Sequence, residues 1–74
     1  MLQQFNERLK MTRKASNKTQ KETAVAIGLG ERNYQSFEYG KIKPSFDTLV
    51  ALAIYFNVSV DYLVGLSENP QANK

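Results

Sequence analysis

The sequence predicts an all-α fold, with five short helices in one domain. Three observations support this prediction. Apolar residues recur at helical spacing along most of the chain. Hydroxyl residues that can cap a helix precede three of these segments, at Thr19, Ser45 and Ser59. A chain of 74 residues is long enough for only one core, which we expect to span residues 1–66, with residues 67–74 as a polar tail or the start of a linker.

Residues 19–40, which read TQKETAVAIGLGERNYQSFEYG, are the segment around which the rest is organised. Thr19 followed three residues later by Glu22 is a capping box, which marks the start of a helix. Gly28 and Gly30 predict a sharp turn, and Gly40 lies just past the end of a second helical segment. Two short helices joined by a tight turn form a helix-turn-helix, whose second helix commonly enters the major groove of DNA.

The remaining helices follow from the same capping and spacing rules. The first helix is expected over residues 2–14, and the fourth over residues 46–56, directly after Ser45. A fifth, over residues 60–64, follows Ser59 and ends at Gly65. The side chains expected to face the core are Leu2, Phe5, Leu9 and Thr12 of the first helix, Tyr34 and Phe37 of the third, and Phe46, Leu49, Leu52, Ala53 and Phe56 of the fourth.

The basic residues are concentrated in one part of the chain. Residues 8–43 hold nine of the ten lysines and arginines against three acidic residues, a net charge of +6, whereas residues 44–74 carry −2. A polyanion is the partner that such a basic segment favours. The alternative is a basic face that is only solvated.

The residue types that are missing exclude several kinds of chemistry. The sequence has no cysteine and no histidine, which removes disulfides, thiol nucleophiles, the usual zinc ligands and the commonest general base. We therefore expect no enzymatic activity, no metal and no cofactor, and no small-molecule ligand is evident. No long apolar run or signal-type amino terminus is present, so we expect a cytoplasmic protein without a membrane partner.

The helix-turn-helix segment resembles the phage-repressor family, also called the Cro or XRE family. The positions that agree with the family pattern are Thr19, Gln20, Ala24, Ile27, Gly28, Leu29, Gly30, Glu38, Gly40 and Pro44. The resemblance continues through residues 45–63 and covers roughly residues 5–66. It implies a compact five-helix phage-repressor-like domain in which the second and third helices bind double-stranded DNA.

The chain also departs from the family pattern in the first two helices. Thr12, Lys18 and Thr23 stand where the family usually has apolar residues, so we expect a less apolar core there. Asn17 stands where the family commonly has glycine, and asparagine tolerates a left-handed backbone.

The resemblance implies that the start and outer face of the third helix read the DNA sequence. The candidates are Glu31, Arg32, Asn33, Gln35 and Ser36. Among these candidates Arg32 is our first choice, because arginine is the commonest bidentate partner of guanine. Two roles stay open for Glu31, which either accepts a hydrogen bond from cytosine or only favours the helix dipole.

Other residues are expected to bind phosphate or to hold the helices together. Gln20 resembles the family's phosphate-binding glutamine, and an amide beside the free N–H groups of a helix N-terminus favours an anion. The further phosphate candidates are Tyr39, Lys41, Lys43, Lys21 and Lys18, and for each lysine a solvated charge is the alternative. The resemblance also implies a structural ion pair between Arg13 and Glu38, for which an exposed acid at Glu38 is the alternative.

The fourth helix is apolar nearly all round, and no charged residue lies between Asp47 and Asp61. Two interpretations stay open: a partner covers the outer side of this helix, or the last helix folds over Ile54. Under the first interpretation we expect a homodimer. Its interface would use some of Ile54, Tyr55, Tyr62, Val64 and Leu66.

These observations predict a sequence-specific DNA-binding transcriptional regulator, a repressor that binds a palindromic operator through its third helix. One alternative is a regulator of the antitoxin or restriction-controller type, which has the same domain. Another is a protein–protein adaptor that has lost DNA binding. Binding to DNA with a steep salt dependence would distinguish the adaptor from the regulators.

Overall fold

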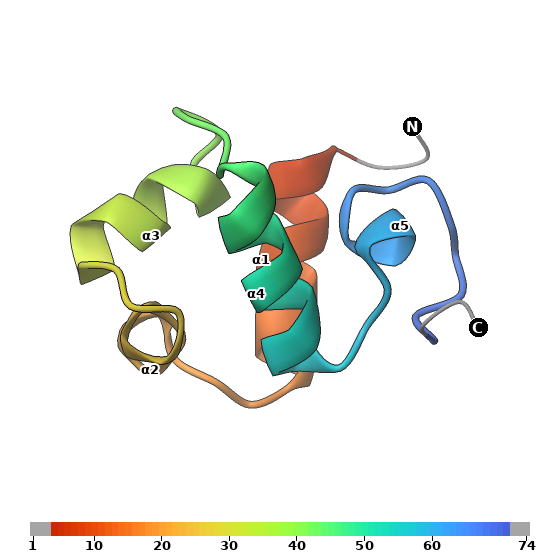
Figure 1. Ribbon diagram of the computed structural model, residues 1–74, viewed down its shortest axis with the longest axis horizontal. Helices are drawn as coiled ribbons and strands as arrows, with labels where there is room; N and C mark the ends of the chain where they lie inside the picture. Colours follow the sequence, from red (N-terminus) through yellow and green to blue (C-terminus); the bar gives the residue numbers. More distant parts are fainter. Residues whose placement is uncertain (1–3, 72–74) are drawn as a thin grey trace.

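The computed structural model describes residues 4–71, within which the chain forms five helices and no strand. The helices are α1 (Phe5–Ala15), α2 (Gln20–Ala26), α3 (Glu31–Glu38), α4 (Phe46–Phe56) and α5 (Val60–Leu63). α2 and α3 lie on one side of the molecule and α5 on the other, with α1 and α4 between them (Figure 1). The predicted all-α, five-helix fold is confirmed.

Capping side chains set where three of the helices begin. The Thr19 hydroxyl accepts from the Glu22 backbone N–H at 3.0 Å, and Glu22 Oε1 accepts from the Thr19 N–H at 2.8 Å. The predicted capping box is therefore present at the start of α2. Ser45 and Ser59 likewise accept from the backbone N–H three residues later and cap α4 and α5.

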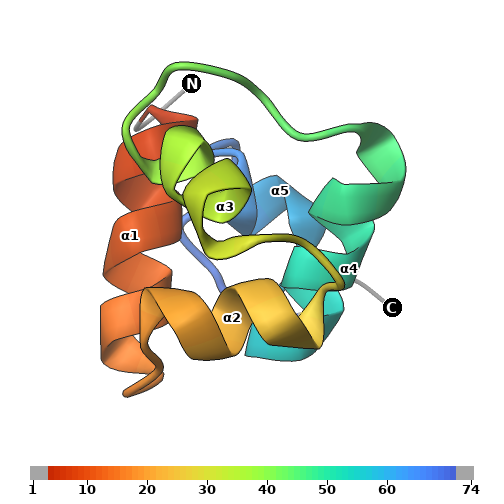
Figure 2. The ribbon, with the colours of Figure 1, turned by 90° about the vertical axis from the view of Figure 1, so that its left-hand side faces the viewer.

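Two expectations about the helices are wrong. α1 begins at Phe5 rather than at residue 2, because Gln4 has an extended backbone with φ −66° and ψ 145°. Leu2 lies outside the described residues. Phe46, expected in the core, has 72% of its surface exposed. The physical reason is its place in the first turn of α4, which lies at the edge of the molecule, away from α1 and α3 (Figure 2).

The core fills the space between the helices. Its buried apolar residues are Leu9, Ala24, Tyr34, Phe37, Leu52, Ala53, Phe56 and Leu63. The core is less apolar between α1 and α2, as expected, because Thr12 and Thr23 are buried there. Each threonine hydroxyl donates to the backbone carbonyl four residues earlier, at 2.7 Å and 2.9 Å, so neither is left without a partner. Lys18, the third departure from the family pattern, is exposed.

A residue in a left-handed backbone conformation lies in the turn on each side of α2. Gly28 has φ +76° directly after α2, and Gly30 then precedes α3 as its N-cap. The Leu29 N–H donates to the Ala24 carbonyl at 2.9 Å and closes the turn. Asn17 has φ +58°, which confirms the left-handed conformation expected between α1 and α2.

Arg8 is buried, although it is charged, with only 2% of its surface exposed. Its Nη1 group donates to the carbonyl oxygens of Tyr62 at 2.9 Å and Ser67 at 3.1 Å. Its Nη2 group lies 3.3 Å from Glu68 Oε2. The chain beyond α5 is therefore held against α1. The longest described helices have 11 residues, and within residues 4–71 no helix has the length and apolar character needed to span a bilayer.

Candidate nucleic-acid interface

The predicted base-reading residues lie along the outer side of α3. Glu31, Arg32 and Asn33 are exposed, and Gln35 and Ser36 are half-buried. The inner side of the same helix is buried. A shallow depression on the outer side is lined by Arg32, Asn33, Gln35, Ser36, Tyr39 and Lys41. The structure therefore brings four of the five candidate readers together with two of the candidate phosphate contacts.

The three remaining lysine candidates are exposed and lie at different places in the fold. Lys43 lies in the loop between α3 and α4 and is exposed, as is Lys21 in the first turn of α2. Lys18 is also exposed, and its Nζ atom lies 6.0 Å from the centre of the Tyr55 ring on α4. α2, the helix that carries Lys21, and α3 both lie on the side of the molecule that faces the viewer in Figure 2.

A buried carboxylate lies beneath the outer face of α3. Glu38 has 5% of its surface exposed and is paired with Arg13, whose Nε lies 2.6 Å from Oε2 and whose Nη2 lies 3.2 Å from Oε1. The Tyr34 hydroxyl donates to Oε2, and Gln20 Nε2 donates to Oε1 at 3.1 Å. These four donors match the roughly four lone-pair positions of an ionised carboxylate. The arrangement ties α3 to α1 and α2.

The same contacts determine the protonation of this cluster. Burial raises the pKa of Glu38, but the hydrogen bonds donated by Arg13, Tyr34 and Gln20 outweigh burial and bring the pKa below its ordinary value of 4.5. Burial, together with the hydrogen bond to Glu38, raises the pKa of the Tyr34 phenol above its ordinary value of 10.0. The hydrogen bond to Glu38 raises the pKa of Arg13. At neutral pH the cluster therefore holds one carboxylate, one guanidinium and a neutral phenol.

Gln20, predicted to bind phosphate, is half-buried and lies between this cluster and the reading face. Its Nε2 group donates to Glu38, and its Oε1 atom accepts from Gln35 Nε2 at 3.0 Å. An amide nitrogen carries two hydrogens, so the bond to Glu38 leaves the second for another acceptor. The Ser36 hydroxyl, in contrast, donates to the Asn33 carbonyl of its own helix at 2.6 Å.

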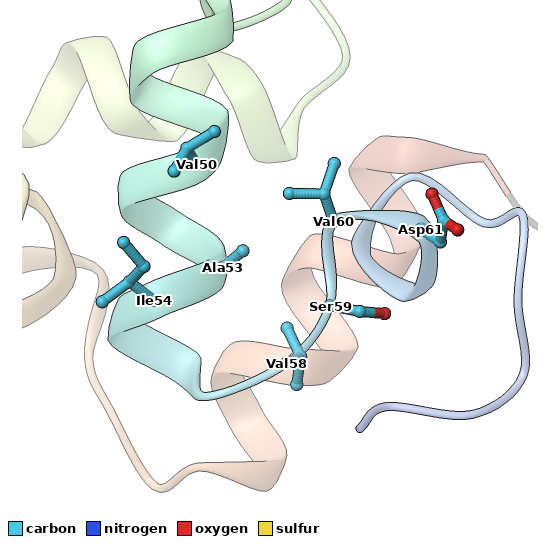
Figure 3. A pocket seen from close by; sticks show the side chains of 7 residues that line it. All are labelled: Val50, Ala53, Ile54, Val58, Ser59, Val60 and Asp61. Carbon is cyan, nitrogen blue, oxygen red and sulfur yellow. The ribbon is translucent and has the colours of Figure 1, made fainter. Parts of the chain in front are cut away.

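The predicted dimer residues differ in how far they are exposed. Ile54 has 74% and Leu66 61% of the surface exposed, whereas Tyr55, Tyr62 and Val64 are half-buried. The interpretation in which the last helix folds over Ile54 is therefore wrong, although α5 contacts both α4 and α1. An apolar groove separates α4 from the segment that leads into α5 (Figure 3). It is lined by Val50, Ala53, Ile54, Val58, Ser59, Val60 and Asp61.

Known proteins of one family resemble this chain in sequence and in fold. A sequence model described as helix-turn-helix matches residues 9–63. The chain belongs to this family, of the phage-repressor (Cro/XRE) type. It is 41% identical over 66 residues to the uncharacterized HTH-type transcriptional regulator YobD of Bacillus subtilis, covering 89% of this chain and 59% of that protein. It is 38% identical over 70 residues to the HTH-type transcriptional regulator ImmR of Bacillus subtilis, covering 95% and 55%.

A solved structure of the helix-turn-helix family has the same fold. The P22 c2 repressor in complex with a synthetic operator superposes with a TM-score of 0.81 and 25% sequence identity, covering 88% of this chain and 98% of that one. The predicted resemblance to phage repressors is confirmed. The chain spans a little more than half the length of its curated relatives YobD and ImmR.

Two residues of this helix-turn-helix domain have contacts that are not predicted from the sequence. Arg8 falls three residues after Phe5 and four before Thr12, on the buried face of α1. That spacing was the signal that could have identified it. The sequence predicts Tyr34 only as a core residue, but Tyr34 stands four residues before Glu38, the spacing at which two side chains of a helix meet.

Proposed function

We propose that this chain is a sequence-specific DNA-binding transcriptional regulator that acts in the cytoplasm and represses by occupying promoter DNA. The observation that carries the proposal is the division of α3 into two sides. One side is anchored through Glu38 to Arg13 of α1, and the other exposes side chains that can contact base edges. The operator complex of the P22 c2 repressor, which has the same fold, supports placing α3 in the major groove.

The same proposal assigns roles to individual residues. Arg32 is the first base reader, with Glu31, Asn33, Gln35 and Ser36 beside it. The contacts to DNA phosphate come from Gln20, Lys18, Lys21, Tyr39, Lys41 and Lys43. Phosphate contacts supply affinity for any sequence, whereas base contacts supply preference. The concentration of basic residues in residues 8–43 supports this division.

A homodimer completes the proposal. Ile54 and Leu66 are exposed, and the groove between α4 and α5 is apolar. A two-fold dimer through this surface would place two copies of α3 about 34 Å apart, which is one turn of DNA, and would require a palindromic operator. Tyr55, Tyr62 and Val64 would form the edges of the interface.

Selection of bound sequences from a random pool of double-stranded DNA tests the proposal. We expect enrichment of a palindrome whose half-sites are centred one helical turn apart. The affinity for the enriched site should fall steeply as salt is raised, because phosphate contacts release counterions. The same selection with Arg32→Ala is the control, and it should enrich a less specific site. Recovery of DNA without any enriched sequence would contradict the proposal.

A further inference from the structure

The feature that carries the inference is an exposed apolar side chain at the edge of an apolar groove. Ile54 has 74% of its surface exposed, and it borders the groove between α4 and the segment that leads into α5 (Figure 3). A two-fold dimer uses the same patch of both copies, so a protruding group on that patch must fit a recess on the same patch. This patch supplies both the protruding side chain and the recess.

The geometry of α4 places two different surroundings on either side of Ile54. Successive residues of an α-helix are about 100° apart around its axis. Ala53 therefore lies to one side of Ile54 and Tyr55 to the other, while Leu52 and Phe56 are buried on the opposite side of the helix. Ala53 lines the groove, whereas Tyr55 does not. Ile54 thus forms a ridge that has the groove on one side and Tyr55 on the other.

Opposite charges lie on the two sides of this ridge. On the groove side, Asp61 is exposed and lines the groove from α5. On the other side, Lys18 is exposed, and its Nζ atom lies 6.0 Å from the centre of the Tyr55 ring. The Arg13 guanidinium donates to the Lys18 carbonyl at 2.9 Å and holds the backbone there. Within residues 4–71 neither Lys18 nor Asp61 forms an ion pair.

We propose that two symmetric ion pairs hold the dimer in register, each between Lys18 of one copy and Asp61 of the other. The inference rests on the homodimer of the proposed function. A two-fold axis beside Ile54 exchanges the two sides of the ridge, so the Lys18 side of one copy faces the Asp61 side of the second. Ile54 of each copy then enters the groove of the other. Charge pairs at the rim of an apolar interface fix its register and exclude wrong partners.

This role of Lys18 differs from phosphate binding because it does not require DNA. Sedimentation in the absence of DNA therefore measures the pairing alone. The structure also separates the pairing from any contact within one chain, because Lys18 and Asp61 lie on opposite sides of the ridge. A change at either residue should act only through the second copy.

The experiment reverses one charge at a time and then mixes the two variants. In the Lys18→Glu homodimer two acids face each other at both rims, and in the Asp61→Lys homodimer two lysines do. Each reversal should weaken dimerisation by roughly 5-fold or more, because two rim pairs are replaced by repulsion. A heterodimer of the two variants has opposite charges at both rims. It should form within about twofold of the wild-type dissociation constant.

A matched control changes the same charge elsewhere. Lys10 is exposed on α1 and lines a separate hollow with Glu7, Met11 and Lys14. Lys10→Glu should leave the dissociation constant of the homodimer unchanged, and it should not rescue Asp61→Lys on mixing. Circular dichroism establishes that each variant is folded.

Neutral variants replace a reversal that does not fold. Asp61→Asn and Lys18→Met should each weaken dimerisation, although less than the reversals do. The two changes combined should cost less than the sum of the single changes, because both remove the same pair. Additive costs would overturn the pairing.

The outcomes separate this inference from the proposed function. Reversed variants that dimerise as tightly as the wild-type chain would overturn the ion pairs and leave the homodimer in place. Weakened homodimers that mixing does not rescue would also overturn them, because the effect would then arise within one chain. A wild-type chain that stays monomeric at every concentration, with and without palindromic DNA, would overturn the proposed homodimer itself.

Discussion

The guanidinium of Arg8 lies 4.2 Å from the centre of the Tyr62 ring, and its Nη1 group donates to the Tyr62 carbonyl at 2.9 Å. The two residues are 54 positions apart in sequence, and their contact joins α1 to α5. The same guanidinium donates to the carbonyl of Ser67 and forms an ion pair with Glu68. A buried cation is stabilised only when such groups surround it, so these contacts compensate for the loss of hydration.

Arg8→Met is expected to lower the free energy of unfolding by about 1.5–3 kcal/mol, the usual loss for hydrogen bonds to a charged group. Glu68→Gln is the matched control, because the Glu68 side chain is 73% exposed and an exposed ion pair contributes roughly 0–1 kcal/mol. Urea denaturation, monitored by circular dichroism, measures the free energy of unfolding of both variants. Equal losses for the two variants would show that the ion pair, and not the carbonyl and ring contacts, stabilises Arg8.

Removal of either partner of the ion pair between Arg13 and Glu38 should destabilise the domain by roughly 3–5 kcal/mol, because the other charge stays buried without compensation. The two side chains are only 11% and 1% exposed, so solvent screens the pair weakly. The variants Arg13→Met and Glu38→Gln, alone and combined, form a double-mutant cycle. The combined change should cost less than the sum of the two single changes. Additive costs would mean that the residues are not coupled.

The pKa of Glu38 predicts how stability depends on pH. Burial raises the pKa of Glu38, but its hydrogen bonds lower this pKa by more, so the pKa lies below the ordinary value of 4.5. The folded state therefore binds a proton at this carboxylate less readily than the unfolded state does. The stability from Glu38 is therefore complete above about pH 4.5 and is lost as the pH falls through the lowered pKa of the folded state. Glu38→Gln should reduce this acid-induced loss between about pH 3 and pH 7.

A second variant, Glu22→Gln, separates the contribution of Glu22 from that of Glu38. Hydrogen bonds with Thr19, of which the one donated by its backbone N–H has the largest effect, lower the pKa of Glu22 as well. This capping-box residue therefore adds to the acid-induced loss of stability. Glutamine can replace glutamate in a capping box, which leaves the helix start intact. If the Glu38→Gln and wild-type curves keep a constant separation over the whole pH range, the linkage assigned to Glu38 is wrong.

Arg32 and Lys43 should contribute to DNA binding in different ways. Arg32→Ala is expected to cost about 1–3 kcal/mol on the preferred site and to relax the preference at one base position per half-site. Lys43→Ala should weaken all sequences about equally and reduce the salt slope by roughly one unit, because a lysine in the loop after α3 offers a point charge to phosphate. The affinities of both protein variants for a panel of single-base variants of the operator measure these effects. Unchanged base preferences in Arg32→Ala would contradict its role as a reader.

Ile54→Lys should prevent dimerisation, because a charge would be buried in the apolar surface between α4 and α5. Met11→Lys, at a 43% exposed position on α1 outside that surface, is the control. Both changes add positive charge, so neither weakens DNA binding through electrostatics. Sedimentation and the stoichiometry on palindromic DNA measure assembly. A monomeric wild-type chain that binds singly to the palindrome would contradict the dimer.

The sequence by itself determined the features that depend on neighbours within about four residues. The capping box of Thr19 and Glu22 and the caps at Ser45 and Ser59 lie where local rules place them, and the left-handed Asn17 lies where the family resemblance implies it. These signals were sufficient because a helix start or a turn is stabilised by groups within its own segment. The family pattern then showed how the segments pack.

Only the tertiary structure decided which distant side chains meet. The hydrogen bond between Gln20 and Gln35 joins residues 15 positions apart, and the contact of Arg8 with Tyr62 joins residues 54 apart. The exposure of Phe46 likewise depends on how far α4 extends beyond the core. Helical spacing assigns a residue to a face, but the neighbour that the face meets depends on how the helices pack. For a polar side chain, that neighbour decides whether it is buried with a partner or directed toward DNA.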